Sequence, residues 1–199
     1  MSKIEEDPRG RGGAGAGVGI GIGASTPEHK ETVILRSKVV VVGDATVGKT
    51  ALTAMFFSGG NAYPKNYVMT IGVDFCMKVV NIPDTGDVNT QVELYLFDSA
   101  GQSIFNQRDL GTKHWKNVSQ VMVVYDVSKR ESFTSCAKWL KAVRDLRPNR
   151  PIQGVLVANK VDLKESGRAV VDSAEGMAFA KEMDLAFFET SALSGTDVD

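Results

Sequence analysis

Residues 43–50 read Gly43-Asp44-Ala45-Thr46-Val47-Gly48-Lys49-Thr50. This stretch fits the pattern G-x-x-x-x-G-K-[ST] of a phosphate-binding loop. The four valines before it, residues 39–42, predict a short strand that is buried on both faces. After it, Leu52, Met55 and Phe56 recur with the spacing of a helix that faces a core. The motif therefore lies in a turn from a strand to a helix, the context in which such loops bind phosphate.

A turn of this kind favours the binding of an anion. Backbone N–H groups converge at the positive end of the helix dipole, and Gly48 lets the backbone approach the phosphates closely. We expect Lys49 to contact the β- and γ-phosphates and to act in catalysis, and the Thr50 hydroxyl to ligate Mg²⁺. The rest of the loop and Ala51 would complete the contacts with the nucleotide. A chance match in a glycine-rich chain is the alternative, and the flanking strand and helix argue against it.

The overall composition is ordinary for one soluble domain. The chain has 199 residues, of which 43% are hydrophobic, and its net charge is −1. This small charge gives no indication of nucleic-acid binding or of attraction to an acidic membrane. The apolar run from Val18 to Ile22 is broken by glycines and is too short for a signal peptide or a membrane span. We therefore expect an intracellular, cytoplasmic protein without a membrane span.

The N-terminal segment differs from the remainder of the chain. Eight of the fourteen residues 10–23 are glycine, and they alternate with small apolar residues. Such a segment has little surface to bury and much conformational entropy to lose, so we predict a disordered tail at residues 1–31. A dinucleotide-binding loop is disfavoured, because no predicted strand precedes the glycines and no amphipathic helix follows them. The folded domain is expected at residues 32–199.

Strand patterns alternate with helix patterns over the rest of the chain. Five further strands are predicted at residues 74–80, 91–97, 121–125, 155–158 and 186–188. The first two read as an antiparallel hairpin around a turn at residues 83–87. The alternation predicts an α/β fold, namely a doubly wound, mostly parallel six-stranded sheet with helices on both faces. In such sheets ligands bind at the carboxyl ends of the strands.

One of the predicted helices begins close to the strand at residues 121–125. Ser128 and Glu131 have the spacing of a capping box, which marks the start of a helix. Phe133, Ala137 and Leu140 then recur at the spacing of a core-facing stripe.

A second chemical motif follows the strand that ends at residue 97. It reads Asp98-Ser99-Ala100-Gly101-Gln102. Asp98 would hold Mg²⁺ through a water molecule, and the Gly101 N–H would bind the γ-phosphate. Gln102 would orient the attacking water, which makes it a candidate catalytic residue. A polar turn at a strand end is the alternative.

A third motif follows the strand that ends at residue 158. It reads Asn159-Lys160-Val161-Asp162. Asn159 can bond to the Hoogsteen edge of a purine, and the stem of Lys160 can lie along the base. The Asp162 carboxylate only accepts hydrogen bonds, so it suits the two adjacent donors of guanine, which adenine lacks. An exposed turn from strand to loop is the alternative.

The last motif, Glu189-Thr190-Ser191-Ala192-Leu193, follows the final strand. The Ala192 N–H would meet the guanine carbonyl, Ser191 would brace the loop, and Leu193 would lie beside the base. Alone this motif is weak, and the N-terminal turn of a helix is its alternative. Together the four motifs occur in order, each at a predicted strand end, and predict a guanine-nucleotide site.

With these motifs the chain resembles a Ras-superfamily small GTPase, and more narrowly a Rab. Rabs carry a stretch like Thr70-Ile71-Gly72-Val73-Asp74-Phe75 across switch I and the start of the next strand. The resemblance covers residues 36–193 and implies that Thr70 ligates Mg²⁺ and contacts the γ-phosphate only in the GTP state. It also implies a nucleotide-dependent switch that hydrolyses GTP slowly unless a partner supplies an arginine.

Within that superfamily the chain is similar to the Rab-like GTPases of intraflagellar transport. The similar segments are residues 83–87, 92–94, 97–101 and 168–175. This resemblance implies a place in the cilium or flagellum and at the basal body, and a heterodimer with a small β-sandwich subunit of the transport complex. GTPase-activating and exchange proteins are further implied partners. Two alternatives stay open: a membrane-trafficking Rab, and a structural subunit that holds nucleotide for stability.

The chain departs from the Rab pattern at several positions. Phe97 and Ser99 flank the switch II aspartate where Rabs usually have tryptophan and threonine, and Ser103 stands where glutamate is usual. Ala45 narrows the space near the γ-phosphate, and Leu193 replaces a common lysine. None of these changes removes a ligand, so we expect hydrolysis to be possible.

The C-terminal end is the largest departure. The chain stops at Asp199, soon after the last predicted strand, where the fold requires one more helix over a sheet face. No cysteine motif for prenylation is present. We interpret this as truncation of a longer protein, and a partner that covers the exposed face is the alternative.

Overall fold

The computed structural model describes residues 32–82, 90–101 and 113–198. The disordered tail predicted at residues 1–31, the turn predicted at residues 83–87 and the candidate catalytic Gln102 lie outside the described residues.

A six-stranded sheet, in the order β2-β3-β1-β4-β5-β6, forms the centre of the fold. Its strands are β1 (Val33–Val42), β2 (Val73–Asn81), β3 (Thr90–Ser99), β4 (Gln120–Asp126), β5 (Gln153–Asn159) and β6 (Ala186–Thr190). Neighbouring strands are parallel except in the β2–β3 hairpin, which is antiparallel. The predicted doubly wound α/β sheet and its hairpin are confirmed.

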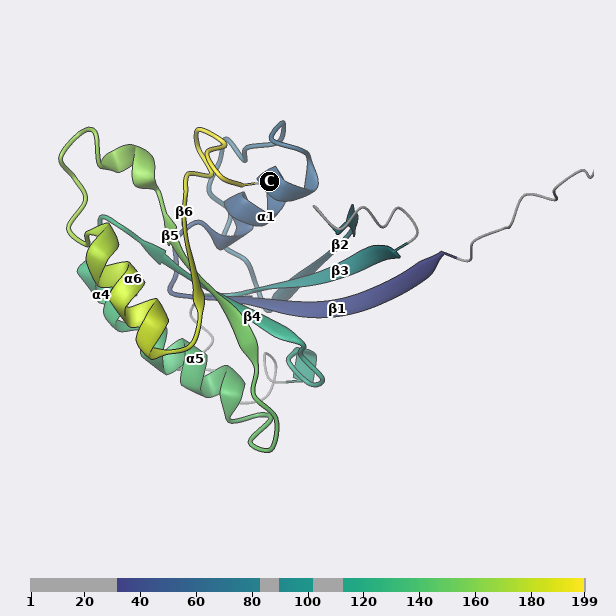
Figure 1. The fold of residues 1–199 in the computed structure, drawn as a ribbon. Coiled ribbons are helices and arrows are strands. Elements are labelled where there is room, and N and C mark those ends of the chain that lie inside the picture. The colour runs from purple at the N-terminus through teal and green to yellow at the C-terminus, as the bar shows by residue number, and fades with distance from the viewer. Residues whose placement is uncertain (1–31, 83–89, 102–112, 199) are drawn as a thin grey trace, which may run out of the picture. The chain divides into compact units, whose positions relative to one another are not determined.

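Helices lie on both faces of the sheet, as predicted. Figure 1 shows α1 (Lys49–Phe57) on one side and α4 (Arg130–Thr134), α5 (Cys136–Arg144) and α6 (Ser173–Glu182) on the other. A short 3₁₀ helix, η1 (Val161–Leu163), follows β5. Two apolar clusters fill the spaces between the sheet and its helices, with α5 and α6 over one cluster and α1 over the other. None of the helices in the described ranges is long and apolar enough to span a membrane.

The start of the helix after β4 differs from the prediction. The Ser128 hydroxyl donates to Asp126 Oδ1 at 2.6 Å instead of capping the helix. Helix α4 begins after Lys129 without a side-chain cap and ends at Thr134. The capping-box prediction was therefore wrong, because the helix begins one residue later than the box requires, with Lys129 and not Ser128 at the N-cap position.

The core-facing stripe of α5 also differs from the prediction. Leu140 is buried as expected, but Ala137 is exposed. The inward positions are occupied by Cys136, Trp139 and Val143. Trp139 is among the largest fully buried side chains of the fold, so the sequence analysis missed a principal member of the core.

The α1 face of the sheet is only partly covered by helix. Beyond α1, a groove of about 400 Å³ is lined by apolar side chains that include Leu94, Met122 and Val155. Phe188 of β6 lines the same groove and is 51% exposed. No helix follows β6 among the described residues, and the segment after β6 folds back through a bridge between Ser191 and Thr196.

Two adjacent residues of β6 test this asymmetry between the faces. Phe187 packs against the cluster under α5 and α6, whereas Phe188 points into the open groove. We expect Phe187→Ala to lower the free energy of unfolding by about 2–3 kcal/mol and Phe188→Ala to lower it by less than about 1 kcal/mol. Urea unfolding of chain 1–199 measures both. Equal losses would contradict the arrangement of the two faces.

Candidate functional site

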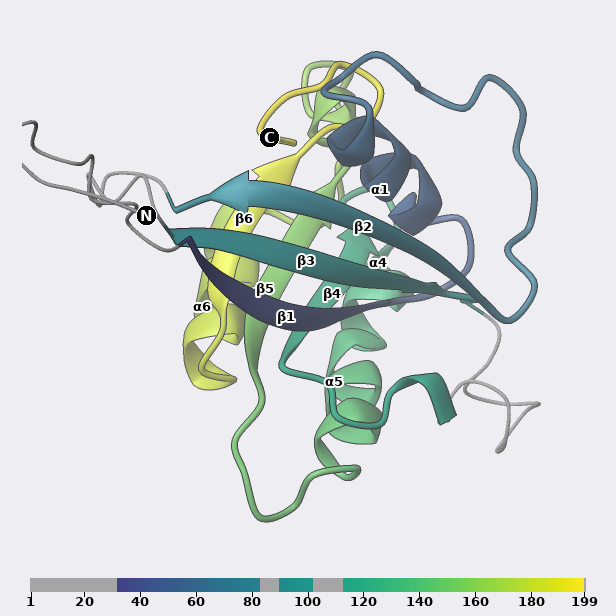
Figure 2. The ribbon, with the colours of Figure 1, turned by 90° about the vertical axis from the view of Figure 1, so that its right-hand side faces the viewer.

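A pocket of about 700 Å³ opens at the carboxyl ends of the strands. It is lined by the loop between β1 and α1, by residues 63–72, by Gly101 and by Lys160. Figure 2 shows the connection from α1 to β2 as a long loop that runs outward from the sheet. Residues from three of the four predicted motifs therefore line one pocket, although they are far apart in the sequence, whereas no residue of the motif at 189–193 lines it.

Gly48 begins α1 in a conformation that excludes other residues. Its φ is 99°, in the left-handed region, and a Cβ placed there would lie 2.3 Å from Asn159 Nδ2. The residue therefore satisfies two requirements at once, the turn into the helix and the close packing of β5 against the loop. The helix N-terminus consequently opens into the pocket, where its N–H groups favour an anion.

Lys49 carries a buried charge at the centre of the site. Its Nζ donates to the backbone oxygens of Gly43 and Asp44, both at 2.9 Å. The side chain is only 6% exposed, and burial lowers the pKa of Lys49 to about 8. A phosphate oxygen at this position would give the ammonium group a charged partner and would raise the pKa again.

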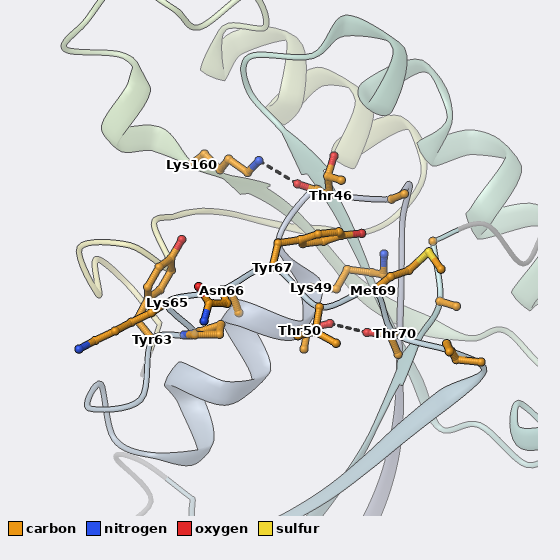
Figure 3. Close-up of a pocket in the computed structure, with 18 of the residues that line it drawn as sticks. Thr46, Lys49, Thr50, Tyr63, Lys65, Asn66, Tyr67, Met69, Thr70 and Lys160 are labelled. Carbon is orange, nitrogen blue, oxygen red and sulfur yellow. Dashed lines mark hydrogen bonds between the residues drawn. The ribbon is translucent and has the colours of Figure 1, made fainter.

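Two hydroxyls and a carboxylate converge beside Lys49. The Thr50 hydroxyl lies 2.8 Å from Thr70 Oγ1 and donates to Asp98 Oδ2 at 2.5 Å. Figure 3 shows the Thr50–Thr70 contact below Lys49, while Lys160 reaches Thr46 above it. Thr70 belongs to the loop after α1, and Asp98 lies near the end of β3, so the exposed loop meets the buried end of β3 at this point.

The geometry around Asp98 fits a hard divalent cation. Its Oδ1 atom is buried and has no hydrogen-bond partner among the described residues. Burial raises the pKa of Asp98, and its bond from Thr50 opposes the rise. Carboxylate and hydroxyl oxygens are the ligands that Mg²⁺ prefers, and an orphaned carboxylate oxygen has coordination capacity to spare. The three side chains predicted to hold Mg²⁺ are therefore suitably placed.

Gly101 lies directly against the phosphate-binding loop. A Cβ added to it would come within 2.5 Å of the peptide that joins Asp44 and Ala45. Only a glycine can pack so closely, so the backbone after β3 reaches the pocket as the sequence predicted.

The amide of Asn159 ties three segments together. Its Nδ2 donates to Val47 O at 2.8 Å, and its Oδ1 accepts from Ala192 N and from Thr190 Oγ1 at 3.2 and 3.3 Å. The side chain is 1% exposed. Sequence analysis assigned Asn159 to a base contact and did not find this bracing of the loop by the ends of β5 and β6.

Two further predicted residues, Asp162 and Ser191, contact each other away from the phosphate-binding loop. The Ser191 hydroxyl donates to Asp162 Oδ1 at 2.6 Å and so fixes the carboxylate. The sequence analysis expected Ser191 to brace its loop. Ala192 is buried beside them, whereas Leu193 is 61% exposed and points away from the core.

Lys160 has a partner that the sequence analysis missed. Its Nζ forms an ion pair with Asp126 Oδ2 at 2.7 Å and donates to Thr46 O at 2.8 Å. Asp126 ends β4 and is almost completely buried. The sequence signal that could have revealed this partner of Lys160 was a carboxylate directly after the buried strand predicted at residues 121–125.

Comparison with known proteins agrees with this geometry. The model of the Ras family matches residues 38–199. The chain belongs to the Ras family. Ras-family small GTPases share the phosphate-binding loop, and they are generally GTP hydrolases.

The chain is similar to relatives named for intraflagellar transport. It is 46% identical to intraflagellar transport protein 27 homolog of Bos taurus over 159 residues, which are 80% of this chain and 82% of that protein. It is 42% identical to intraflagellar transport protein 27 of Chlamydomonas reinhardtii over 172 residues, 84% and 81% of the two chains. Ras-related protein Rab-10 of Diplobatis ommata is 31% identical over 170 residues, 85% and 79%. Both resemblances inferred from the sequence are confirmed.

The bracing role of Asn159 gives a prediction that needs no ligand. We expect Asn159→Ala to lower the free energy of unfolding by about 3 kcal/mol, because three buried hydrogen bonds are lost together. Thr190→Val removes the longest of the three and should cost about 1 kcal/mol. Urea unfolding of nucleotide-free protein measures both losses. Equal and small losses would show that Asn159 does not brace the loop.

Proposed function

We propose that the chain is a small GTP-binding protein that holds GTP or GDP with Mg²⁺, hydrolyses GTP slowly and acts in intraflagellar transport. We place the GTPase domain at residues 32–199. The observation that carries the proposal is the pocket in which the buried Lys49 lies beside the Thr50 and Thr70 hydroxyls, with Thr50 bonded to Asp98. Lys160 lines the same pocket, and the Asp162 carboxylate that follows it accepts a bond from Ser191.

At the phosphate end, the residues supply charge and backbone donors. Lys49 would leave the carbonyls of Gly43 and Asp44 for the β- and γ-phosphates, since a phosphate oxygen is the stronger acceptor. Thr50, Thr70 and Asp98 would hold Mg²⁺, which neutralises the charge on the phosphates. The N–H of Gly101 would bind the γ-phosphate, because the backbone there is in contact with the loop.

At the base end, the arrangement favours guanine. The bond from Ser191 orients the Asp162 carboxylate, so that its free lone pairs can accept from the ring N–H and exocyclic amine of guanine. The base would lie along the stem of Lys160, whose ion pair with Asp126 holds it in place. Adenine would leave Asp162 without donors, which is costly in a partly buried site.

A switch follows from the placement of Thr70. The loop that carries it is exposed at Tyr67, Val68 and Ile71, so little packing holds this segment in one position. Binding of Mg²⁺ and the γ-phosphate by Thr70 would order the loop, and hydrolysis would release it. A partner that reads the ordered loop would then distinguish GTP from GDP.

Slow hydrolysis is expected from the lining of the pocket. Gln102 would orient the attacking water, and no arginine lines the pocket within the part of the chain that the structure describes. An arginine from an activating partner would add a factor on the order of 10³–10⁵.

The assignment to intraflagellar transport rests on the relatives named above. It would place the protein in the cytoplasm, at the basal body and in the cilium, with a small β-sandwich subunit as partner and with exchange and activating proteins.

A structural subunit that binds nucleotide for stability is a second candidate. The bracing of the loop by Asn159 favours it, because a ligand on the loop would then stabilise the ends of β5 and β6.

Asp162→Asn tests the guanine specificity. We expect the affinity for GDP to fall by at least about a hundredfold and the affinity for xanthosine diphosphate to rise, because the amide donates where xanthine has a carbonyl. Equilibrium titration with the two nucleotides measures this, and Asp184→Asn on the exposed surface serves as the matched control. Unchanged GDP affinity in Asp162→Asn would remove Asp162 from the base site.

Recovery of partners from ciliated cells tests the cellular role. The full protein is tagged as wild type, as Thr50→Asn to favour GDP or the empty state, and as Gln102→Leu to favour GTP. A switch predicts transport subunits only with the GTP-favouring forms, whereas a structural subunit predicts them with all three. Vesicle tethers or a prenyl-binding escort in place of transport subunits would contradict the assignment to intraflagellar transport and support a trafficking Rab.

A further inference from the structure

A single hydrogen bond joins the phosphate-binding loop to helix α5. Trp139 Nε1 donates to Asp44 Oδ1 at 2.8 Å, and the two residues are 95 positions apart in the sequence. The rest of the Trp139 side chain is buried in the core beneath α5, together with Leu140 and Val143 of the same helix. Trp139 does not line the pocket, so any effect it has on a ligand there is indirect.

The loss of the hydrogen bond between Trp139 and Asp44 would lower the stability of the fold. The indole N–H is the only polar group of Trp139, which is 1% exposed, and a buried donor without an acceptor is costly. The acceptor is a carboxylate, which makes the bond stronger than one between neutral groups. Because the ring is fixed by its packing, the Asp44 carboxylate is held at a fixed point relative to α5.

The Asp44 backbone is the part of the loop where other contacts meet. Its carbonyl oxygen accepts from Lys49 Nζ at 2.9 Å. Its peptide link to Ala45 is the surface against which Gly101 packs, with no room for a Cβ. A shift of Asp44 would therefore displace both the lysine and the glycine backbone that are proposed to bind the phosphates.

We propose that Trp139 is a positioning residue for the nucleotide: through Asp44 it holds the Asp44–Ala45 peptide so that Lys49 and Gly101 meet the phosphates, and it thereby slows nucleotide release. This inference rests on the proposed nucleotide binding. It assigns to α5, a helix with no contact to the pocket, control over how long the nucleotide stays bound.

Trp139→Phe is the direct test, because it keeps an aromatic ring in the core and removes the donor. Release of fluorescently labelled GDP from the full chain, with Mg²⁺ present and excess unlabelled GDP, is expected to be on the order of tenfold faster than in wild type. Val143→Ala is the matched control. It also removes buried atoms from α5, but it leaves the bond to Asp44 in place, so its release rate should stay within about twofold of wild type.

A double-mutant cycle shows whether the effect passes through Asp44. Asp44→Ala should also speed release, and Trp139→Phe combined with Asp44→Ala should be no faster than the faster single variant. Asp44→Asn keeps an oxygen that accepts from the indole, so its release should be slower than that of Asp44→Ala. This comparison stays decisive if Trp139→Phe does not fold.

The outcomes separate this inference from the proposed function. A wild-type protein that binds no GDP would overturn both. A wild-type protein that retains GDP, with Trp139→Phe releasing it at the same rate, would overturn the positioning role alone. Three further outcomes would also overturn the positioning role. The two substitutions could speed release independently, so that the double variant is faster than either single variant. Asp44→Asn and Asp44→Ala could release GDP at the same rate, or Val143→Ala could release it as fast as Trp139→Phe.

Discussion

The buried charge of Lys49 is the constraint on which the site depends. Its ammonium group is almost excluded from solvent, and its hydrogen bonds go to two backbone oxygens. No carboxylate forms an ion pair with it among the described residues, and burial lowers its pKa. The fold therefore holds a cation at a cost, and an anion at the start of α1 would offset that cost. This is the physical reason why we propose that the loop binds phosphate and not a neutral ligand.

The other parts of the site hold the loop around that charge. The Asn159 amide fixes Val47 from β5, the Lys160–Asp126 pair fixes Thr46, and Trp139 fixes Asp44. The phosphate-binding loop is thus attached to its surroundings at three of its residues, 44, 46 and 47, whereas the segment that carries Thr70 is largely exposed. One wall of the pocket is held by side-chain bonds from the core, and we expect the exposed wall to be the one that responds to a ligand.

Sequence reasoning predicted the fold correctly, and it proposed the site residues, for identifiable reasons. The run of valines at residues 39–42 predicts a buried strand in an α/β protein. Each chemical motif follows a strand, and in a doubly wound sheet ligands bind at the carboxyl ends of the strands. It did not find the links between motifs. The bonds of Asn159 and Trp139 join residues 112 and 95 positions apart, and no local pattern encodes them. The prediction of the helix after β4 was wrong for a different, local reason, since Lys129 and not Ser128 is the N-cap and α4 ends at Thr134, and Ala137 of α5 is exposed.

The most direct test of the central claim is the equilibrium binding of GDP and ADP to the purified, nucleotide-free chain, with and without Mg²⁺. A guanine-specific phosphate site predicts GDP binding at least about a thousandfold tighter than ADP binding, and slower release of GDP when Mg²⁺ is present. Equal affinity for the two nucleotides, or no binding of either, would contradict the function assigned to this site.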